Sequence, residues 1–210
     1  FGTRHGLYTR NPDSGNLRLV PVPGRDPHAA IGSLNYDHDI LWVGGEEDGL
    51  WGFRPGRHSE TVLAGTEIML ADRCVNVIHR GSGNDLWVGT RDGLYRIDIA
   101  TRQVEYIAAD PADPQALPGR YIVSLLRDDL GRLWVGTFGG GIAVLTGRNQ
   151  DNKPRFQRLG LDRGLPHMNV GSMQMDSAGT IWAGTDDGLA MIDPQTLTAR
   201  SVRRAEGAPL

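Results

Sequence analysis

A four-residue phrase built around tryptophan recurs along the 210-residue chain and restricts what the chain can fold into. The copies are Leu41–Gly44, Leu86–Gly89, Leu133–Gly136 and Ile181–Gly184, and their tryptophans are 45, 47 and 48 residues apart. A fifth copy, Phe1-Gly2-Thr3, opens the chain without its tryptophan. A period of about 40–50 residues is typical of four-stranded propeller blades.

Each repeat divides into four short strands, A to D in chain order. Strand A is an apolar run starting 11 or 12 residues before the tryptophan, and strand B carries the tryptophan phrase. Asp-Gly turns such as Arg91-Asp92-Gly93 favour a tight hairpin between strands B and C. We therefore predict an all-β fold, a partial β-propeller from a longer chain, with about four and a half four-stranded antiparallel blades. They span approximately residues 1–22, 28–65, 73–108, 120–160 and 168–204 of a single fragment, 1–210.

The tryptophans and the glycines two positions later are predicted to be structural. An indole is large enough to fill the gap between stacked blades, and a glycine keeps the same face flat where side chains crowd. The residues concerned are Trp42, Trp87, Trp134, Trp182, Gly44, Gly89, Gly136 and Gly184. Cys74 begins an apolar run, so we expect a buried, inert thiol.

The full phrase, Leu-Trp-Val-Gly-Thr followed by turn residues and Gly-Leu, resembles the two-component regulator propeller repeat. It reads Leu86–Leu94 in one copy and Ile181–Leu189 in another, and the family's Leu-Pro approach to strand A is present at Leu117-Pro118 and Leu165-Pro166. The resemblance covers essentially the whole chain, with departures such as Gly45 in place of the threonine.

The resemblance implies a function in signalling. Such repeats are similar to those in periplasmic sensor regions of bacterial membrane receptors, whose output domain is a histidine kinase or a diguanylate cyclase. We therefore expect a periplasmic, non-catalytic, ligand-sensing module, with the anchor and any kinase or cyclase domain outside this chain. The alternatives are a propeller enzyme of lyase or glycosidase type, and a protein-interaction propeller.

Composition limits the partners. A net charge of −3 gives no field for binding nucleic acid. No residue set at metal or catalytic spacing is evident, so we expect no cofactor, no metal and no catalytic residue. The acidic runs Glu46-Glu47-Asp48 and Asp186-Asp187 are predicted to be solvated hairpin turns.

The residues just before strand A are the candidate ligand contacts, because strand A is the innermost strand of a propeller blade. Arginine and amide side chains suit carboxylates or sugar hydroxyls, and tyrosine offers a stacking face. A small molecule or a saccharide is compatible with such a set. The candidates are Arg73, Arg120, Tyr121, His167 and Asn169.

The two chain ends lead to a prediction about assembly. The chain begins inside strand B and ends just before a further strand A is due. A seven-bladed ring at this period needs about 320 residues. We therefore expect an open arc whose end faces contact further blades of the same protein or self-associate. A small five-bladed ring is the alternative.

Overall fold

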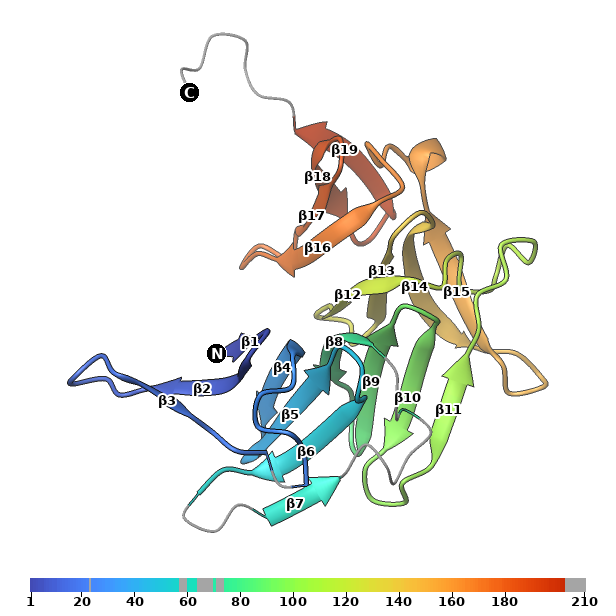
Figure 1. Ribbon diagram of the computed structural model, residues 1–210. Coiled ribbons are helices and arrows are strands. Elements are labelled where there is room, and N and C mark those ends of the chain that lie inside the picture. The colour runs from blue at the N-terminus through green and yellow to red at the C-terminus, as the bar shows by residue number, and fades with distance from the viewer. Residues whose placement is uncertain (23, 57–59, 64–69, 71–73, 203–210) are drawn as a thin grey trace, which may run out of the picture. The chain divides into compact units, whose positions relative to one another are not determined.

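The computed structural model forms antiparallel β-sheets joined by turns (Figure 1). It describes residues 1–22, 24–56, 60–63, 70 and 74–202. The chain divides into two compact units, Phe1–Tyr106 and Ile107–Leu210.

The first unit contains three sheets. The first is three-stranded: β1 (Gly2–Thr3), β2 (Gly6–Arg10) and β3 (Leu17–Leu19). The second comprises β4 (Ile31–Asp37), β5 (Ile40–Gly45), β6 (Leu50–Arg54) and β7 (Glu60–Leu63). The third comprises β8 (Val75–Arg80), β9 (Asp85–Thr90), β10 (Leu94–Asp98) and β11 (Val104–Ile107), whose last residue lies at the division between the units.

The second unit contains two four-stranded sheets. One comprises β12 (Ile122–Arg127), β13 (Leu133–Thr137), β14 (Gly141–Arg148) and β15 (Pro154–Leu159). The other comprises β16 (Val170–Met175), β17 (Ile181–Thr185), β18 (Gly188–Asp193) and β19 (Thr198–Val202). A single-turn 3-10 helix, η2 (Leu161–Arg163), joins the two sheets.

The strands follow the predicted division of the repeat. In every sheet consecutive strands pair in chain order, and the pairs from β12 to β15 are antiparallel. The first strands of the four-stranded sheets begin at the predicted residues, Ile31, Val75, Ile122 and Val170. The all-β prediction is confirmed. β14 runs on to Arg148, and the short helix η2 was not predicted from the sequence.

A threonine closes the hairpin between the second and third strands of the repeat in four copies. Its hydroxyl donates to a carbonyl on the far side of the hairpin and accepts a backbone N–H within it, so two turn groups are satisfied locally. The donated bonds are Thr3 to Gly6 (2.8 Å), Thr90 to Gly93 (3.0 Å), Thr137 to Gly141 (2.9 Å) and Thr185 to Gly188 (2.7 Å).

The remaining copy, with Gly45 in place of the threonine, is held by an ion pair. The guanidinium of Arg25 donates to both carboxylate oxygens of Asp48, and its Nη2 also donates to the carbonyl of Ala30 at 2.9 Å. A Cβ on Gly45 would lie 2.7 Å from that Nη2, so the missing side chain makes room for the pair. The prediction of a solvated turn here was wrong for Asp48, because its partner lies 23 residues earlier.

Within each unit, neighbouring sheets meet at the repeat glycine. A Cβ on Gly136 would lie 3.0 Å from Cγ1 of Val170, the first residue of the next sheet. The equivalent approaches in the first unit are Gly2 to Ile31 and Gly44 to Val75. The glycine therefore forms a socket for the β-branched residue that begins the next sheet.

The tryptophans lie on the second strands of their sheets, and their partners on the first strands are Asn35, His79, Leu126 and Gln174. Trp42 and Trp134 have no exposed surface, Trp87 is 6% exposed, and Trp182 is half-buried. Trp134 joins a cluster with Val170, Ile181 and Ile192 of the following sheet. In the second unit the indole therefore does pack between two sheets.

Cys74 is less buried than expected. It is half-buried, and its thiol donates to Oδ1 of Asn76 at 3.4 Å. Desolvation raises the pKa of the thiol, so Cys74 remains protonated at neutral pH.

Candidate functional site

Four of the five candidate residues lie at one end of the second unit. Arg120 and Tyr121 precede β12, and His167 and Asn169 precede β16, the first strand of the next sheet. β12 and β16 are in contact, so the two pairs occupy the same end of neighbouring sheets. Arg73 falls outside the described residues.

Two hairpins close on this end of the sheets. The backbone N–H of Phe138 donates to the carbonyl of Tyr121 at 2.9 Å, and that of Asp186 donates to the carbonyl of Asn169 at 3.3 Å. Tyr121 and Asn169 occupy equivalent positions, each just before the buried first residue of its strand. The repeat thus brings a hairpin side chain against a side chain that precedes the first strand.

These side chains form two different pairs. The rings of Tyr121 and Phe138 are tilted by 43°, with centroids 5.7 Å apart. The amide Nδ2 of Asn169 donates to a carboxylate oxygen of Asp186 at 2.6 Å. Phe138 is 53% exposed and Asp186 is exposed, so an aromatic face and an amide–carboxylate pair both face solvent.

His167 and Arg120 complete the predicted set. Nδ1 of His167 accepts the backbone N–H of Asn169 at 3.0 Å, so in the neutral ring Nε2 carries the hydrogen and is a donor. The imidazole is half-buried, and the side chain of Arg120 is exposed. The end of the second unit therefore presents aromatic, amide, carboxylate, imidazole and guanidinium groups.

Phe138 and Asp186 were not among the predicted ligand contacts. Each directly follows the threonine of its hairpin, Thr137 and Thr185. Their position directly after the threonine could have identified them in the sequence. The hydrogen bonds of the threonine turn the next residue back toward the start of the first strand. The run Asp186-Asp187 is exposed as predicted, but Asp186 also has a side-chain partner.

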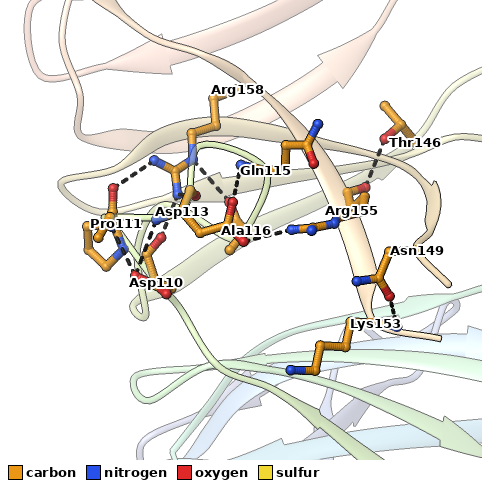
Figure 2. Close-up of polar contacts among 11 residues, drawn as sticks. Asp110, Pro111, Asp113, Gln115, Ala116, Thr146, Asn149, Lys153, Arg155 and Arg158 are labelled. Carbon is orange, nitrogen blue, oxygen red and sulfur yellow. Dashed lines mark hydrogen bonds and ion pairs between the residues drawn. The ribbon is translucent and has the colours of Figure 1, made fainter. Parts of the chain in front are cut away.

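The segment that leads into β12 is held by Arg158 of β15. Its guanidinium donates to four backbone carbonyls, those of Asp110 (2.7 Å), Pro111 (3.1 Å), Asp113 (2.5 Å) and Ala116 (3.0 Å). Figure 2 shows these carbonyls gathered around the guanidinium. Arg158 therefore positions the segment from which Arg120 and Tyr121 extend.

A neighbouring arginine on the same strand adds a second tie to this segment. Arg155 donates to the carboxylate of Asp113 at 2.7 Å (Figure 2). The pKa of Asp113 is lowered, first by the backbone N–H of Gln115 and then by Arg155. Neither arginine was singled out from the sequence, because their partners lie 42 to 48 residues away.

A groove of about 870 Å³ runs beside this anchored segment. Its walls combine apolar side chains, open glycine backbone and cationic groups, which suits a ligand with both apolar and hydrogen-bonding surface. The lining includes Pro118, Gly140, Gln157, Arg158, Arg163 and Met168. Gly140 lies against the backbone of Pro118 and Gly119, which directly precede Arg120, so the groove adjoins the candidate contacts.

Two structural features concern the described residues as a whole. No group of three or more His, Cys, Asp or Glu side chains among them is arranged to hold a metal ion. None of the helices in the part of the chain that the structure describes is long and apolar enough to cross a membrane.

The sheets have strands that pair in chain order, and neighbouring sheets within a unit pack through the repeat glycine and a buried tryptophan. This arrangement defines a β-propeller repeat protein. The family model named two component regulator propeller matches residues 116–139 and 164–187. These segments run from the approach to the first strand to the hairpin after the tryptophan strand, in both sheets of the second unit. Two segments of the chain therefore match the two-component regulator propeller repeat.

Solved structures share the fold at low sequence identity. An extracellular domain of a hybrid two-component system from B. thetaiotaomicron matches with a TM-score of 0.73 and 23% identity, over 99% of this chain. The match covers only 27% of that chain, so this chain spans about a quarter of its length. No curated protein matches the sequence.

Other solved structures with different descriptions match less well. A protein described as a gluconolactonase has a TM-score of 0.58 and 15% identity, over 91% of this chain and 68% of its own. The WD40 domain of Neurospora crassa Pan2 has a TM-score of 0.54 and 13% identity, over 81% and 48%. At these identities the similarity is one of fold, and it confirms the propeller prediction.

Proposed function

We propose that this chain is a ligand-sensing module without catalytic activity, in the periplasmic part of a bacterial two-component or cyclic-di-GMP receptor. The observation that carries the proposal is the match of both sheets of the second unit to the two-component regulator propeller repeat. The described extracellular location of the B. thetaiotaomicron domain supports the compartment. Detection by this module would be passed to an output domain elsewhere in the receptor.

The proposed ligand site is the end of the second unit that carries Tyr121, Phe138, Asn169 and Asp186. A ring pair offers an apolar face, and an amide beside a carboxylate offers one donor group and several acceptors. Saccharides present the complementary surface, since a pyranose has an apolar face and an edge of hydroxyls. Arg120 and His167 add donors suited to an acidic sugar.

Calorimetric titration with a neutral and a uronate oligosaccharide tests the site. Tyr121→Ala should weaken binding by about tenfold, which corresponds to loss of one aromatic contact. Tyr36→Ala is the matched control, because Tyr36 is exposed at the opposite end of its strand β4. Affinity unaffected by Tyr121→Ala and by Asn169→Ala would rule out this end as the binding surface.

The enzyme alternative makes a different prediction. A lyase or glycosidase needs a positioned acid or base, and Asp186 supplies an exposed carboxylate within the proposed site. Turnover of an oligosaccharide panel that disappears in Asp186→Asn would replace the sensing proposal with catalysis. We expect no turnover by the unmodified chain.

A further inference from the structure

The groove beside the segment anchored by Arg158 has a size that suits a small molecule of its own. Its volume of about 870 Å³ lies within the range of small-molecule sites, roughly 300–1,000 Å³. Its walls come from the segment before β12, the hairpin between β13 and β14, strand β15 and the link that contains η2. The proposal of saccharide sensing uses the neighbouring side chains of Tyr121 and Asn169 and assigns no ligand to this groove.

One wall of the groove is apolar and is built around the thioether of Met168. A Cβ on Gly141 would lie 3.4 Å from Sδ of Met168, and a Cβ on Gly160 would lie 3.3 Å from it. The side chain therefore rests against two buried glycines, while Met168 itself is half-buried and lines the groove. Pro114 and Pro118 add rigid apolar rings to the lining. Because thioethers make favourable contacts with aromatic rings, this wall favours a flat aromatic group.

Two arginines make another part of the lining cationic. Arg158 donates to four backbone carbonyls, and Nη1 of Arg163 donates to the carbonyl of Leu197 at 3.4 Å. All of these acceptors are neutral, so they satisfy N–H groups without cancelling either positive charge. Among the described residues of the lining, Asp162 is the one carboxylate, and it is exposed to solvent. The charges therefore favour an anionic group in the groove over a cationic one.

Arg163 is the better placed of the two arginines to bind that anionic group directly. A guanidinium has five N–H donors, and the hydrogen bond of Arg163 to Leu197 is long and uses only one of them. The planar fork of a guanidinium binds a carboxylate through two parallel hydrogen bonds. Arg158 uses its donors on the carbonyls of the anchored segment, so it contributes charge to the groove and holds the wall in place.

We propose that the groove binds an aromatic carboxylate, with its ring against Met168 and the prolines and its carboxylate on Arg163. The two parts of such a ligand match the two kinds of wall. The site lies beside the surface that carries Tyr121 and Asn169, and it does not rest on saccharide sensing there.

Calorimetric titration of the full chain with cinnamate and with its neutral amide, cinnamamide, tests the charged wall. We expect cinnamate to bind about tenfold more tightly than the amide, as one charge-assisted pair would give. Arg163→Gln should remove this preference, and Arg163→Lys should keep part of it, because lysine retains the charge and loses the fork. Arg200→Gln is the matched control, since Arg200 is an exposed arginine of β19 outside the groove lining.

Met168→Ala tests the apolar wall independently of Arg163. It should weaken binding of both probes alike, by about threefold or more, because it removes the thioether and leaves the charge. Tyr121→Ala should leave both affinities unchanged, whereas it should weaken oligosaccharide binding, so the two proposals can fail separately. Equal affinity for the acid and the amide, or an acid preference that survives Arg163→Gln, would overturn the groove proposal. Cinnamate binding that is unchanged in Met168→Ala, or that is lost in Tyr121→Ala, would overturn it as well.

Discussion

The indole nitrogen of Trp134 donates a hydrogen bond of 2.8 Å to the carboxylate of Asp128, six residues earlier in the turn before β13. The same carboxylate accepts the backbone N–H of Arg132 at 2.8 Å and its guanidinium at 2.7 Å. Nη2 of Arg132 continues to the carbonyl of Pro194 in the next sheet, also at 2.7 Å. A carboxylate whose side chain is only 3% exposed thus connects the interblade tryptophan to the neighbouring blade.

Asp128→Ala should destabilise the chain by about 2–4 kcal/mol, because it leaves the buried indole N–H of Trp134 and the Nε–H of Arg132 without their acceptor. Asp176→Ala removes the equivalent hydrogen bond to Trp182. Because that indole is only half-buried, the loss in free energy of unfolding should be clearly smaller. Urea unfolding of both variants gives the comparison. Equal losses would show that burial does not set the strength of this bond.

Stability should fall in acid partly through Asp128. Burial opposes its ionisation, but hydrogen bonds from Trp134 and Arg132 outweigh burial and hold its pKa below the usual value. A lowered folded-state pKa contributes stability that is present above the unfolded value, about 3.9, and is lost as pH falls through the folded-state pKa. Thermal unfolding from pH 6 to pH 2 should show a shallower acid decline in Asp128→Asn, and an unchanged slope would contradict the assignment.

Trp134→Ala and Trp87→Ala should each destabilise the chain by roughly 3–5 kcal/mol by opening a cavity in a packed site. The two rings are 0% and 6% exposed. Trp182→Ala is the internal comparison. Because the ring of Trp182 is half-buried, its removal should lower the free energy of unfolding by a smaller amount. Losses below about 1 kcal/mol in urea melts would mean that the rings are not filling a packed space.

Gly45→Thr should be destabilising, by about 1–3 kcal/mol, although threonine is the residue that the other copies use. Its Cβ would displace the Arg25 guanidinium and the Asp48 carboxylate from their pairing. Gly56→Thr is a control with no atom within 4 Å of the new Cβ. A neutral or stabilising Gly45→Thr would mean that the ion pair can be exchanged for the threonine hairpin without loss.

Gly136→Ala and Gly184→Ala should differ although they occupy the same repeat position. At Gly136 the added methyl meets Val170 and the side chain of Ser124 at 3.0 and 3.1 Å, and should cost about 1–3 kcal/mol. At Gly184 it meets only the Ser172 hydroxyl, so the change should stay within about 0.5 kcal/mol. Differential scanning calorimetry measures the melting temperatures. Similar decreases in both variants would contradict the assignment of Gly136 as a socket for Val170.

The sequence by itself determined the period, the strand order and the first residue of each strand A, because these follow from local patterning that alternates apolar residues with turn residues. It also located Tyr121 and Asn169 before their strands. It could not show that Phe138 and Asp186 fold back onto them, since that requires the hairpin geometry. Only the tertiary structure decided the partners of Arg25 and Arg158, because a guanidinium can reach many carbonyls and carboxylates, and packing of segments 20 to 50 residues apart selects which ones. The tertiary structure also decided the role of Gly136, because Val170, the residue that fills its socket, belongs to the next blade.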